Sequence, residues 1–267
     1  MKKLHIYITL IGLFTLIGCV EDINPNFEFE EQVFISGLMT HEDGFVSIQV
    51  QKTVSVTDTT FSAVNDAQVS LFTKDASNTV SLVSNSFDIE NGTYTTSEMI
   101  TPIIGNIYWI EVMLQDETVF ISEEEVLTPP IPIMDMVKNG NTVTLSITGP
   151  LDEQNFYLFR IEIIRDGILF SDEIGVGLDR IINENEEKFL TIGDINDGDT
   201  VKASLYNINY STFQFYSNVV SNLGNEPEVS ALFLPINLIG NIKNITTNEV
   251  ALGNFGVAGF SVMTQDF

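Results

Sequence analysis

Few side chains in this sequence could form a nucleophilic or metal-binding site. Cys19 is the only cysteine among 267 residues, and His41 is the only histidine after His5. Zinc sites usually take three or four cysteine, histidine or carboxylate ligands, and a serine triad needs a histidine beside the serine. His41 lies in the segment THEDG, which is typical of a solvent-exposed turn. The chain contains no G-x-S-x-G, phosphate-loop or dinucleotide motif, so we expect neither an enzymatic activity nor a cofactor.

Carboxylates are the most abundant reactive groups in the chain. There are 37 Asp and Glu residues against 11 Lys and Arg, which gives a formal net charge of −26. Such a chain repels phosphate backbones, so we expect no nucleic-acid partner. A pair of carboxylates could hydrolyse a glycosidic bond, but among so many acids no pair stands out. We interpret Glu123, Glu124 and Glu125, and also Asp88 and Glu90, as solvated surface acids.

One acidic segment has the spacing of a metal-binding loop. In GDINDGDT, the side chains of Asp194, Asn196, Asp197 and Asp199 place oxygen atoms around a glycine, as the start of a calcium loop does. The glutamate that completes an EF-hand loop is missing. An ordinary Asp-Gly hairpin turn is the alternative. The sequence therefore leaves calcium binding near Asp197 open, and it identifies no metal ligand elsewhere.

The residues before Cys19 indicate that its thiol is a modification site. Residues 1–18 begin with two lysines, continue with an apolar run of about a dozen residues, and end on Gly18, which is the layout of a secretory signal peptide. The run is shorter than the roughly 20 residues that a membrane-spanning helix needs. The motif Leu-Ile-Gly-Cys resembles the bacterial lipobox, which implies lipidation of Cys19 and removal of residues 1–18. A buried thiol in an ordinary signal or core segment is the alternative.

The remainder of the chain has the pattern of antiparallel β-structure. Residues 19–32 are acidic, lack a helical period, and are expected to form a tether. Beyond them, short runs rich in Val, Ile, Phe, Thr and Tyr alternate with turn residues, as in β-sandwiches. Around residues 45–51, Phe45, Val46, Ile48 and Val50 are expected on one buried face. We interpret Trp109 as a core residue.

A proline-rich segment divides this β-pattern. Thr128–Pro132 contains three prolines, which remove backbone donors and favour an extended linker. We therefore expect a domain boundary there, with one β-sandwich at 33–127 and a β-rich C-terminal domain at 128–267. The predicted fold class is mainly β, with two β-sandwich domains that are immunoglobulin-like or transthyretin-like.

One segment of the second domain has a helical period. Within STFQFYSNVVSNLG, the apolar residues follow a spacing of three and four, so we predict a short helix near 211–223. Ser211 and Gln214 are placed as a capping box, and Gly224 as the stop. After this helix, the glycine-containing segments GNIKN and GNFGVAGFS are expected to return to strand and to approach the core closely.

The order of these motifs resembles one family. The segments that carry the resemblance are the lipobox, VFISGLM, AVNDAQVSLF, GTY, GNIYWIEV, the TPP break, the aromatic helix, GNI and LGNFGVAGFS. Together they resemble the domain of unknown function 4249 family of Bacteroidota outer-membrane lipoproteins, which are usually encoded beside TonB-dependent receptors. Residues 33–127 also resemble transthyretin-like sandwiches, which bind or present and seldom catalyse.

The resemblance implies a location and a role. It implies a lipid-anchored protein of the outer membrane that faces the cell exterior and acts as a non-catalytic accessory or ligand-binding subunit of a TonB-dependent receptor complex in nutrient uptake. A structural or adhesive surface lipoprotein without a transporter is the alternative. Glu21 and Asp22, which follow the lipidated cysteine, resemble the Bacteroidota signal that directs lipoproteins to the outer face of the outer membrane.

Overall fold

The computed structural model describes residues 30–54, 62–149, 154–178, 188–223 and 238–267. A compact unit runs from Glu31 to Phe267. The predicted lipidation site Cys19, the predicted export residues Glu21 and Asp22, the signal segment and most of the tether lie outside the described residues. In the described part, no helix has both the length and the apolar character needed to cross a bilayer.

The described residues are mainly β-strands, as the sequence predicts, with one helix, α2 (Tyr210–Leu223). Before the proline-rich segment the strands are β1 (Val33–Thr40), β2 (Ser47–Lys52), β3 (Ser62–Ala63), β4 (Gln68–Lys74), β5 (Val80–Ser84), β6 (Phe87–Glu90), β7 (Thr93–Thr96), β8 (Ile107–Met113), β9 (Val119–Ser122) and β10 (Glu125–Val126). After it they are β11 (Ile133–Asn139), β12 (Thr142–Ile147), β13 (Phe156–Arg165), β14 (Ile168–Leu178), β15 (Lys188–Ile192), β16 (Thr200–Ile208), β17 (Ile239–Asn244) and β18 (Glu249–Asp266).

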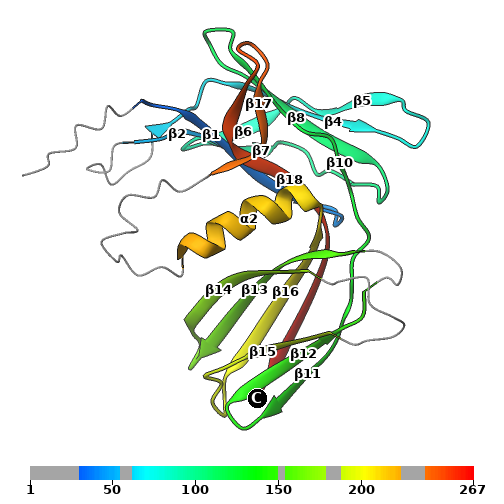
Figure 1. Cartoon of the computed structure of the whole chain (residues 1–267), viewed down its shortest axis with the longest axis vertical. Coiled ribbons are helices and arrows are strands. Elements are labelled where there is room, and N and C mark those ends of the chain that lie inside the picture. Colours follow the sequence, from blue (N-terminus) through cyan, green and yellow to red (C-terminus); the bar gives the residue numbers. More distant parts are fainter. Residues whose placement is uncertain (1–29, 55–61, 150–153, 179–187, 224–237) are drawn as a thin grey trace, which may run out of the picture. The chain divides into compact units, whose positions relative to one another are not determined.

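Most strands belong to one large sheet. Its main path runs in the order β5-β4-β8-β9-β17-β18-β1-β2-β7-β6, and its end strands, β5 and β6, are neighbours in the sequence. The sheet is therefore nearly closed. β13, β14 and β16 extend it through pairing of β16 with β18, and β11, β12 and β15 form a separate small sheet (Figure 1).

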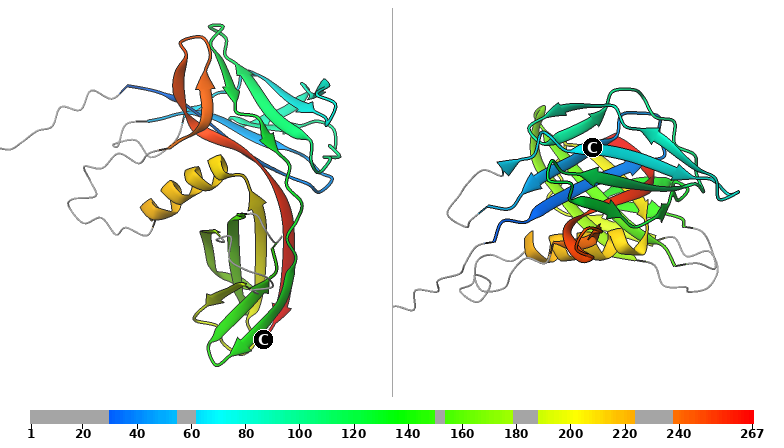
Figure 2. Two further views of the ribbon diagram at one scale, coloured as in Figure 1. Left: turned by 45° about the vertical axis from the view of Figure 1, so that its right-hand side comes forward. Right: turned by 90° about the horizontal axis from the view of Figure 1, so that it is seen from above.

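The last strand joins both halves of the molecule. β18 is 18 residues long. Its first part, Leu252–Ala258, pairs in parallel with β1, and its last part, Ala258–Asp266, pairs with β16 (Figure 2). The sequence pattern did not predict this return of the C-terminal segment to the first half of the chain. The segment expected as a separate domain at 128–267 thus supplies β17 and part of β18 to the first sheet.

The first core shows the alternation that the sequence predicts, with one exception. It is built from buried residues between Ile35 and Leu127, together with Ile242, Phe255 and Val257 of the C-terminal segment. Ile48 and Val50 are fully buried, as expected, whereas Phe45 is 60% exposed, so its expected burial was wrong. The two-residue period places Val46, Ile48 and Val50 on the buried face, and it places Phe45 on the opposite, exposed face with Ser47 and Gln49.

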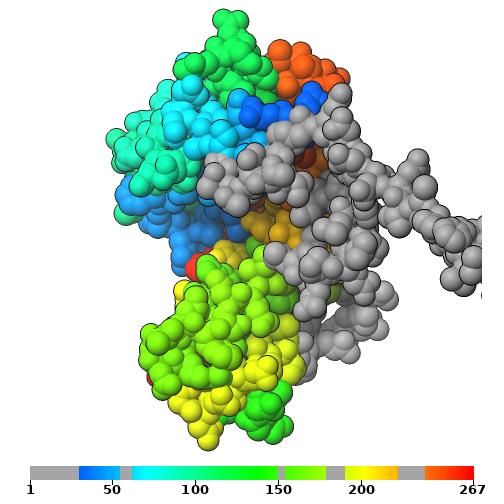
Figure 3. All heavy atoms as spheres, turned by 90° about the vertical axis from the view of Figure 1, so that its left-hand side faces the viewer, coloured from blue at the N-terminus to red at the C-terminus, as the bar shows by residue number. Residues whose placement is uncertain are grey.

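A second core lies on the other side of the proline-rich segment. Its buried members lie between Ile131 and Leu205, and the chain passes from the first core to the second between Leu127 and Ile131. Burying one large aliphatic side chain contributes about 1.5–3 kcal/mol, so each core has its own substantial hydrophobic stabilisation. The space-filling view in Figure 3 shows β13 and β14, in yellow-green, gathered on one face of this half.

The motifs AVNDAQ and GTY are tied to each other in the first core. The hydroxyl of Tyr94, which is buried, donates to the carbonyl oxygen of Val64 and accepts from the backbone N–H of Ala67, both at 2.9 Å. Asn65 Oδ1 accepts from the backbone N–H of Gly92 at 2.7 Å. These motifs therefore have a structural explanation, because each satisfies buried backbone groups of the other.

Candidate functional site

The most buried glutamate among the described residues lies where the two cores meet. Glu125 is 3% exposed and belongs to the short strand β10, just before the proline-rich segment. Its carboxylate accepts hydrogen bonds from Ser211 Oγ, from Thr212 Oγ1 at 3.0 Å, from Asn241 Nδ2 at 3.1 Å, from the backbone N–H of Val257 at 3.2 Å and from Asn209 Nδ2 at 3.3 Å. The carboxylate thus connects β10, the start of α2, β17 and β18. We call this group of residues the Glu125 junction.

The electrostatics of Glu125 follow from its partners. Each of these partners is a neutral group, and no ion pair joins Glu125 to a Lys or Arg in the described part of the chain. Burial raises the pKa of Glu125, and the hydrogen bonds from Ser211 and Thr212 oppose that rise. The start of α2 also favours the ionised form of Glu125, because the first N–H groups of a helix carry partial positive charge.

The local sequence explains how α2 begins here. The backbone N–H of Phe213 donates to the carbonyl oxygen of Asn209, which makes Asn209 the residue that precedes the helix. The predicted capping box was therefore wrong, since Ser211 lies inside the first turn and its hydroxyl donates to Glu125. Gln214 donates instead to the hydroxyl of Tyr210 at 3.0 Å. Glu125, an acid from a distant strand, thus accepts from the side-chain hydroxyls of Ser211 and Thr212 in the first turn of α2.

Asn241 completes the strand pairing beside Glu125. The register of β17 on β18 is irregular between Ile239 and Lys243. Within this gap, Asn241 Nδ2 donates to the carbonyl oxygen of Phe255 at 2.8 Å, and Asn241 Oδ1 accepts from the backbone N–H of Phe255 at 2.9 Å. The side chain therefore replaces a backbone partner of Phe255, and the same Nδ2 also donates to Glu125.

Glycines allow β18 to pass close to its neighbours, as the sequence predicts. Gly253 has φ of +106°, and a Cβ there would lie 1.8 Å from the carbonyl oxygen of Ile35. A Cβ on Gly256 would lie 2.6 Å from Thr212 Oγ1, and one on Gly259 would lie 2.2 Å from the carbonyl oxygen of Pro129. Side chains at these three glycines of GNFGVAGF would therefore collide with the neighbouring segments of the chain.

A second set of contacts fastens the linker to both halves. Thr128 Oγ1 accepts from the backbone N–H of Gly259 at 3.1 Å and donates to the carbonyl oxygen of Asn207 at 2.5 Å. Asn207 Nδ2 donates to the carbonyl oxygen of Pro129 at 3.0 Å. These contacts hold the linker against β16 and β18.

His41 also contacts β18. Its Nδ1 accepts from the backbone N–H of Phe260 at 3.1 Å, so His41 is not the free turn residue that the sequence indicates.

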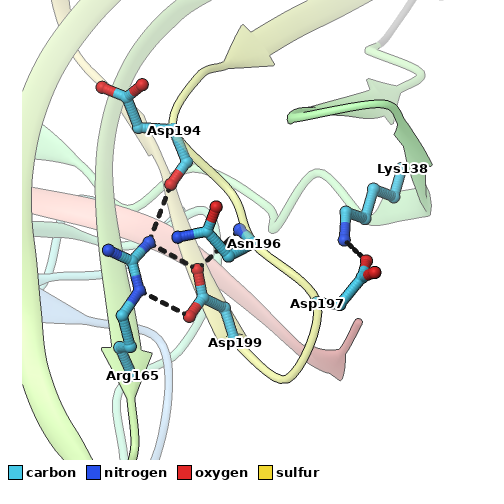
Figure 4. A network of polar contacts seen from close by, with 6 residues as sticks. All are labelled: Lys138, Arg165, Asp194, Asn196, Asp197 and Asp199. Carbon is cyan, nitrogen blue, oxygen red and sulfur yellow. Dashed lines mark hydrogen bonds and ion pairs between the residues drawn. The ribbon is translucent and has the colours of Figure 1, made fainter.

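The acidic loop that the sequence compares with a calcium site is bound by two cationic side chains of the protein, Arg165 and Lys138 (Figure 4). Arg165 forms a bidentate contact with Asp199, with Nε to Oδ1 at 2.9 Å and Nη2 to Oδ2 at 2.8 Å. Arg165 Nη2 also donates to the carbonyl oxygen of Asp194 at 3.0 Å, and the backbone N–H of Asn196 donates to Asp199 Oδ2 at 2.8 Å. Lys138 pairs with Asp197. Two cations of the protein itself thus pair with two of the three aspartates of this loop, as in a hairpin turn held by ion pairs.

Asp199 and its guanidinium partner form a buried ion pair. The side chain of Asp199 is 1% exposed. The hydrogen bonds from Arg165 lower the pKa of Asp199 to about 2. Arg165 comes from the end of β13, and the loop lies between β15 and β16, so the contact joins segments far apart in sequence. The described residues contain no group of three or more His, Cys, Asp or Glu side chains that could hold a metal ion.

The other acidic candidates differ from Glu125. Glu123 pairs with Lys243 at 2.8 Å and Glu124 pairs with Lys74, and both carboxylates are about half exposed, as the sequence predicts. Glu125 was wrongly interpreted as a third solvated acid. One signal could have identified it, because a two-residue period places Glu125 on the same side as the buried Leu127, while Val126 is 44% exposed.

Trp109 is 7% exposed and stacks on Phe72 with ring centroids 5.4 Å apart, which confirms it as a core residue.

These features define a mainly β protein with two apolar cores that share one long strand and one buried polar junction. The chain belongs to the family described as domain of unknown function (DUF4249), because the family model matches residues 20–263. No curated protein matches the sequence.

The chain is also similar to solved structures, although the similarity described here is weak. One match is a crystal structure of a DUF4785 family protein from Legionella pneumophila, with 11% identity and a TM-score of 0.27. The match covers 64% of this chain and 49% of that protein, so this chain corresponds to about half of its length. A similarity of this size carries no inference about fold or function.

Proposed function

We propose that this protein is a lipid-anchored outer-membrane lipoprotein that faces the cell exterior and acts as a non-catalytic accessory or ligand-binding subunit of a TonB-dependent receptor complex. The observation that carries the proposal is the position of Cys19. It ends a lipobox-like motif after an apolar segment, and the family match begins at the next residue, Val20. The proposed anchor thus directly precedes the family domain.

The burial of two carboxylates is in keeping with the non-catalytic part of this proposal. The carboxylates of Glu125 and Asp199 are 3% exposed or less, and protein donors surround both. A general acid or base must come within hydrogen-bond reach of its substrate. A substrate in solution cannot reach these two carboxylates while they are buried in this way. In this proposal the two cores correspond to two sandwich-like halves, the first of them transthyretin-like, which present a surface to a partner.

The anchor and its address can be tested separately. Replacing Cys19→Ala should abolish incorporation of labelled palmitate, whereas replacing Glu21 and Asp22 with alanine should retain the label. The second variant should lose cleavage by protease added to intact cells, because the protein would no longer reach the outer face. Glu28 and Glu30 provide a matched control, since they are acids of the same tether that do not follow the cysteine. Unchanged cleavage of the Glu21 and Asp22 variant would refute the export role.

The partner can be tested by affinity purification. A tag placed after Phe267 should recover a TonB-dependent receptor from membranes dissolved in mild detergent, and the Cys19→Ala variant should recover much less. Recovery of the anchored protein without any such receptor would refute the proposed complex. That outcome would favour the alternative of a structural or adhesive lipoprotein.

A further inference from the structure

The second core contains a partly open cavity of about 270 Å³. It lies between the small sheet of β11, β12 and β15 and the strands β13, β14 and β16. Its walls include Leu145, Tyr157, Phe159, Val176, Leu190 and Leu205. No charged side chain lines it, and most of its surface is aliphatic or aromatic. The cavity is distinct from the Glu125 junction, none of whose residues contributes to its lining.

The size and lining of the cavity define what can fill it. Protein interiors are close-packed, so a space of this size is uncommon in a core. Tyr157 and Ser204 supply the hydroxyl groups of the lining, and the other lining side chains offer none of the roughly two to four polar partners that a buried water molecule needs. An apolar cavity of about 150 Å³ holds benzene, so the present one has room for a fused pair of aromatic rings or a short hydrocarbon chain.

The charges of the same strands point away from the cavity. Tyr157, Phe159 and Ile161 line it, and the strand alternation places Arg160 and Glu162 on the opposite face of β13. There, Arg160 binds Asp172 at 2.6 Å, and Glu162 accepts from Lys202 at 2.7 Å. The cationic groups of β13 and β16 are thus already paired outside. An anionic ligand would find no cationic side chain in the lining of the cavity.

We propose that this cavity is a binding site for a small, neutral, apolar molecule. The proposal goes beyond the receptor-accessory role and does not depend on it, because the site lies within the compact unit and needs no anchor or partner. A ligand with a charged group would have to place that group in apolar surroundings, which costs affinity.

The direct test uses two fluorescent probes of the same ring size. 1-Aminonaphthalene is neutral at pH 7, and 5-aminonaphthalene-1-sulfonate is an anion. The chain from Val20 onward contains the whole compact unit, and a cooperative thermal transition would establish its folding. We expect saturable binding of the neutral probe with one site per chain, and binding of the sulfonate at least about tenfold weaker. Absence of saturable binding of the neutral probe, or equal binding of both probes, would overturn the proposal.

A cavity-filling variant locates the site. Ala203 is buried and lines the cavity, so Ala203→Leu should reduce affinity for 1-aminonaphthalene by at least about tenfold. Ala251→Leu is the matched control, because Ala251 packs against the first core. If Ala203→Leu does not fold, Gly177→Val is the substitute, since a Cβ on Gly177 meets only Phe159, at 3.7 Å. Unchanged affinity in a folded cavity-filling variant would show that the probe binds elsewhere and would contradict the assignment.

Discussion

Glu125 and Asp199 are both buried carboxylates, but their surroundings differ in one respect. Glu125 accepts hydrogen bonds only from neutral groups, whereas Asp199 accepts a bidentate contact from the Arg165 guanidinium. Burial raises the pKa of Glu125, and Arg165 lowers the pKa of Asp199 to about 2. The comparison shows that the partner, and not burial alone, decides which protonation state the fold favours.

The largest effect is expected at the Glu125 junction. Glu125→Ala would leave several buried donors without an acceptor, among them Asn241 and the backbone N–H of Val257. We expect a loss of about 3 kcal/mol or more in the free energy of unfolding, measured with urea. Glu124→Ala is the matched control, because its carboxylate is 48% exposed, and it should change stability by less than about 1 kcal/mol. Equal losses in the two variants would contradict the role of the junction.

The second prediction concerns the guanidinium partner. Arg165→Ala would leave the Asp199 carboxylate buried without its cation, and would also remove the contact of Arg165 with the Phe170 ring at 3.8 Å. Arg160→Ala removes a similar bidentate pair, but its partner Asp172 is 33% exposed and can be hydrated. We expect the melting temperature to fall at least about twice as far in Arg165→Ala as in Arg160→Ala. The reverse order would show that burial of Asp199 has no energetic consequence.

The third prediction is the acid dependence of the Asp199 pair. Because the folded-state pKa is below the ordinary value of 3.8, the pair contributes stability above pH 3.8 that is lost as the pH falls towards 2. The difference in unfolding free energy between the wild-type protein and Asp199→Asn should therefore be constant above that window and shrink within it. A difference that stays constant down to pH 2 would refute the assignment.

The fourth and smallest effect has the opposite sign. The folded-state pKa of Glu125 is above the ordinary value of 4.5, so the folded protein holds this proton more tightly than the unfolded chain does. Its contribution to stability is fully present below pH 4.5 and decreases as the pH rises through the folded-state pKa. The wild-type protein should accordingly lose stability relative to Glu125→Gln over that range. A gain over the same range would contradict the predicted sign.

Local patterns predicted local structure well. The alternation around β2 identified Ile48 and Val50 as buried, and the apolar spacing identified α2 within one residue of its start. Phe45 was assigned wrongly because it was grouped with Ile48 and Val50, whereas a two-residue period places it on the other face of the strand. The close passage of GNFGVAGF was predicted because glycine permits it.

Long-range contacts could not be predicted from the sequence. The partners of Glu125 come from residues 84 to 132 positions away, and its run of three glutamates has the composition of a solvated surface. The pairing of β18 with β1 is equally remote, since strand alternation does not identify the neighbouring strand. Arg165 was not associated with the acidic loop for the same reason. Cys19, Glu21 and Asp22 lie outside the described residues, and their roles stay predictions.

The central structural claim is that the Glu125 junction and β18 make the two cores one cooperative unit. Hydrogen exchange measured by mass spectrometry along a urea titration tests it most directly, because amides of β1 and β2 report on the first core and those of β13 and β16 report on the second. In the wild-type protein, both groups should lose protection at the same urea concentration. In Glu125→Ala, the two midpoints should separate. Separate midpoints in the wild-type protein, or a single shared midpoint that persists in Glu125→Ala, would contradict the account.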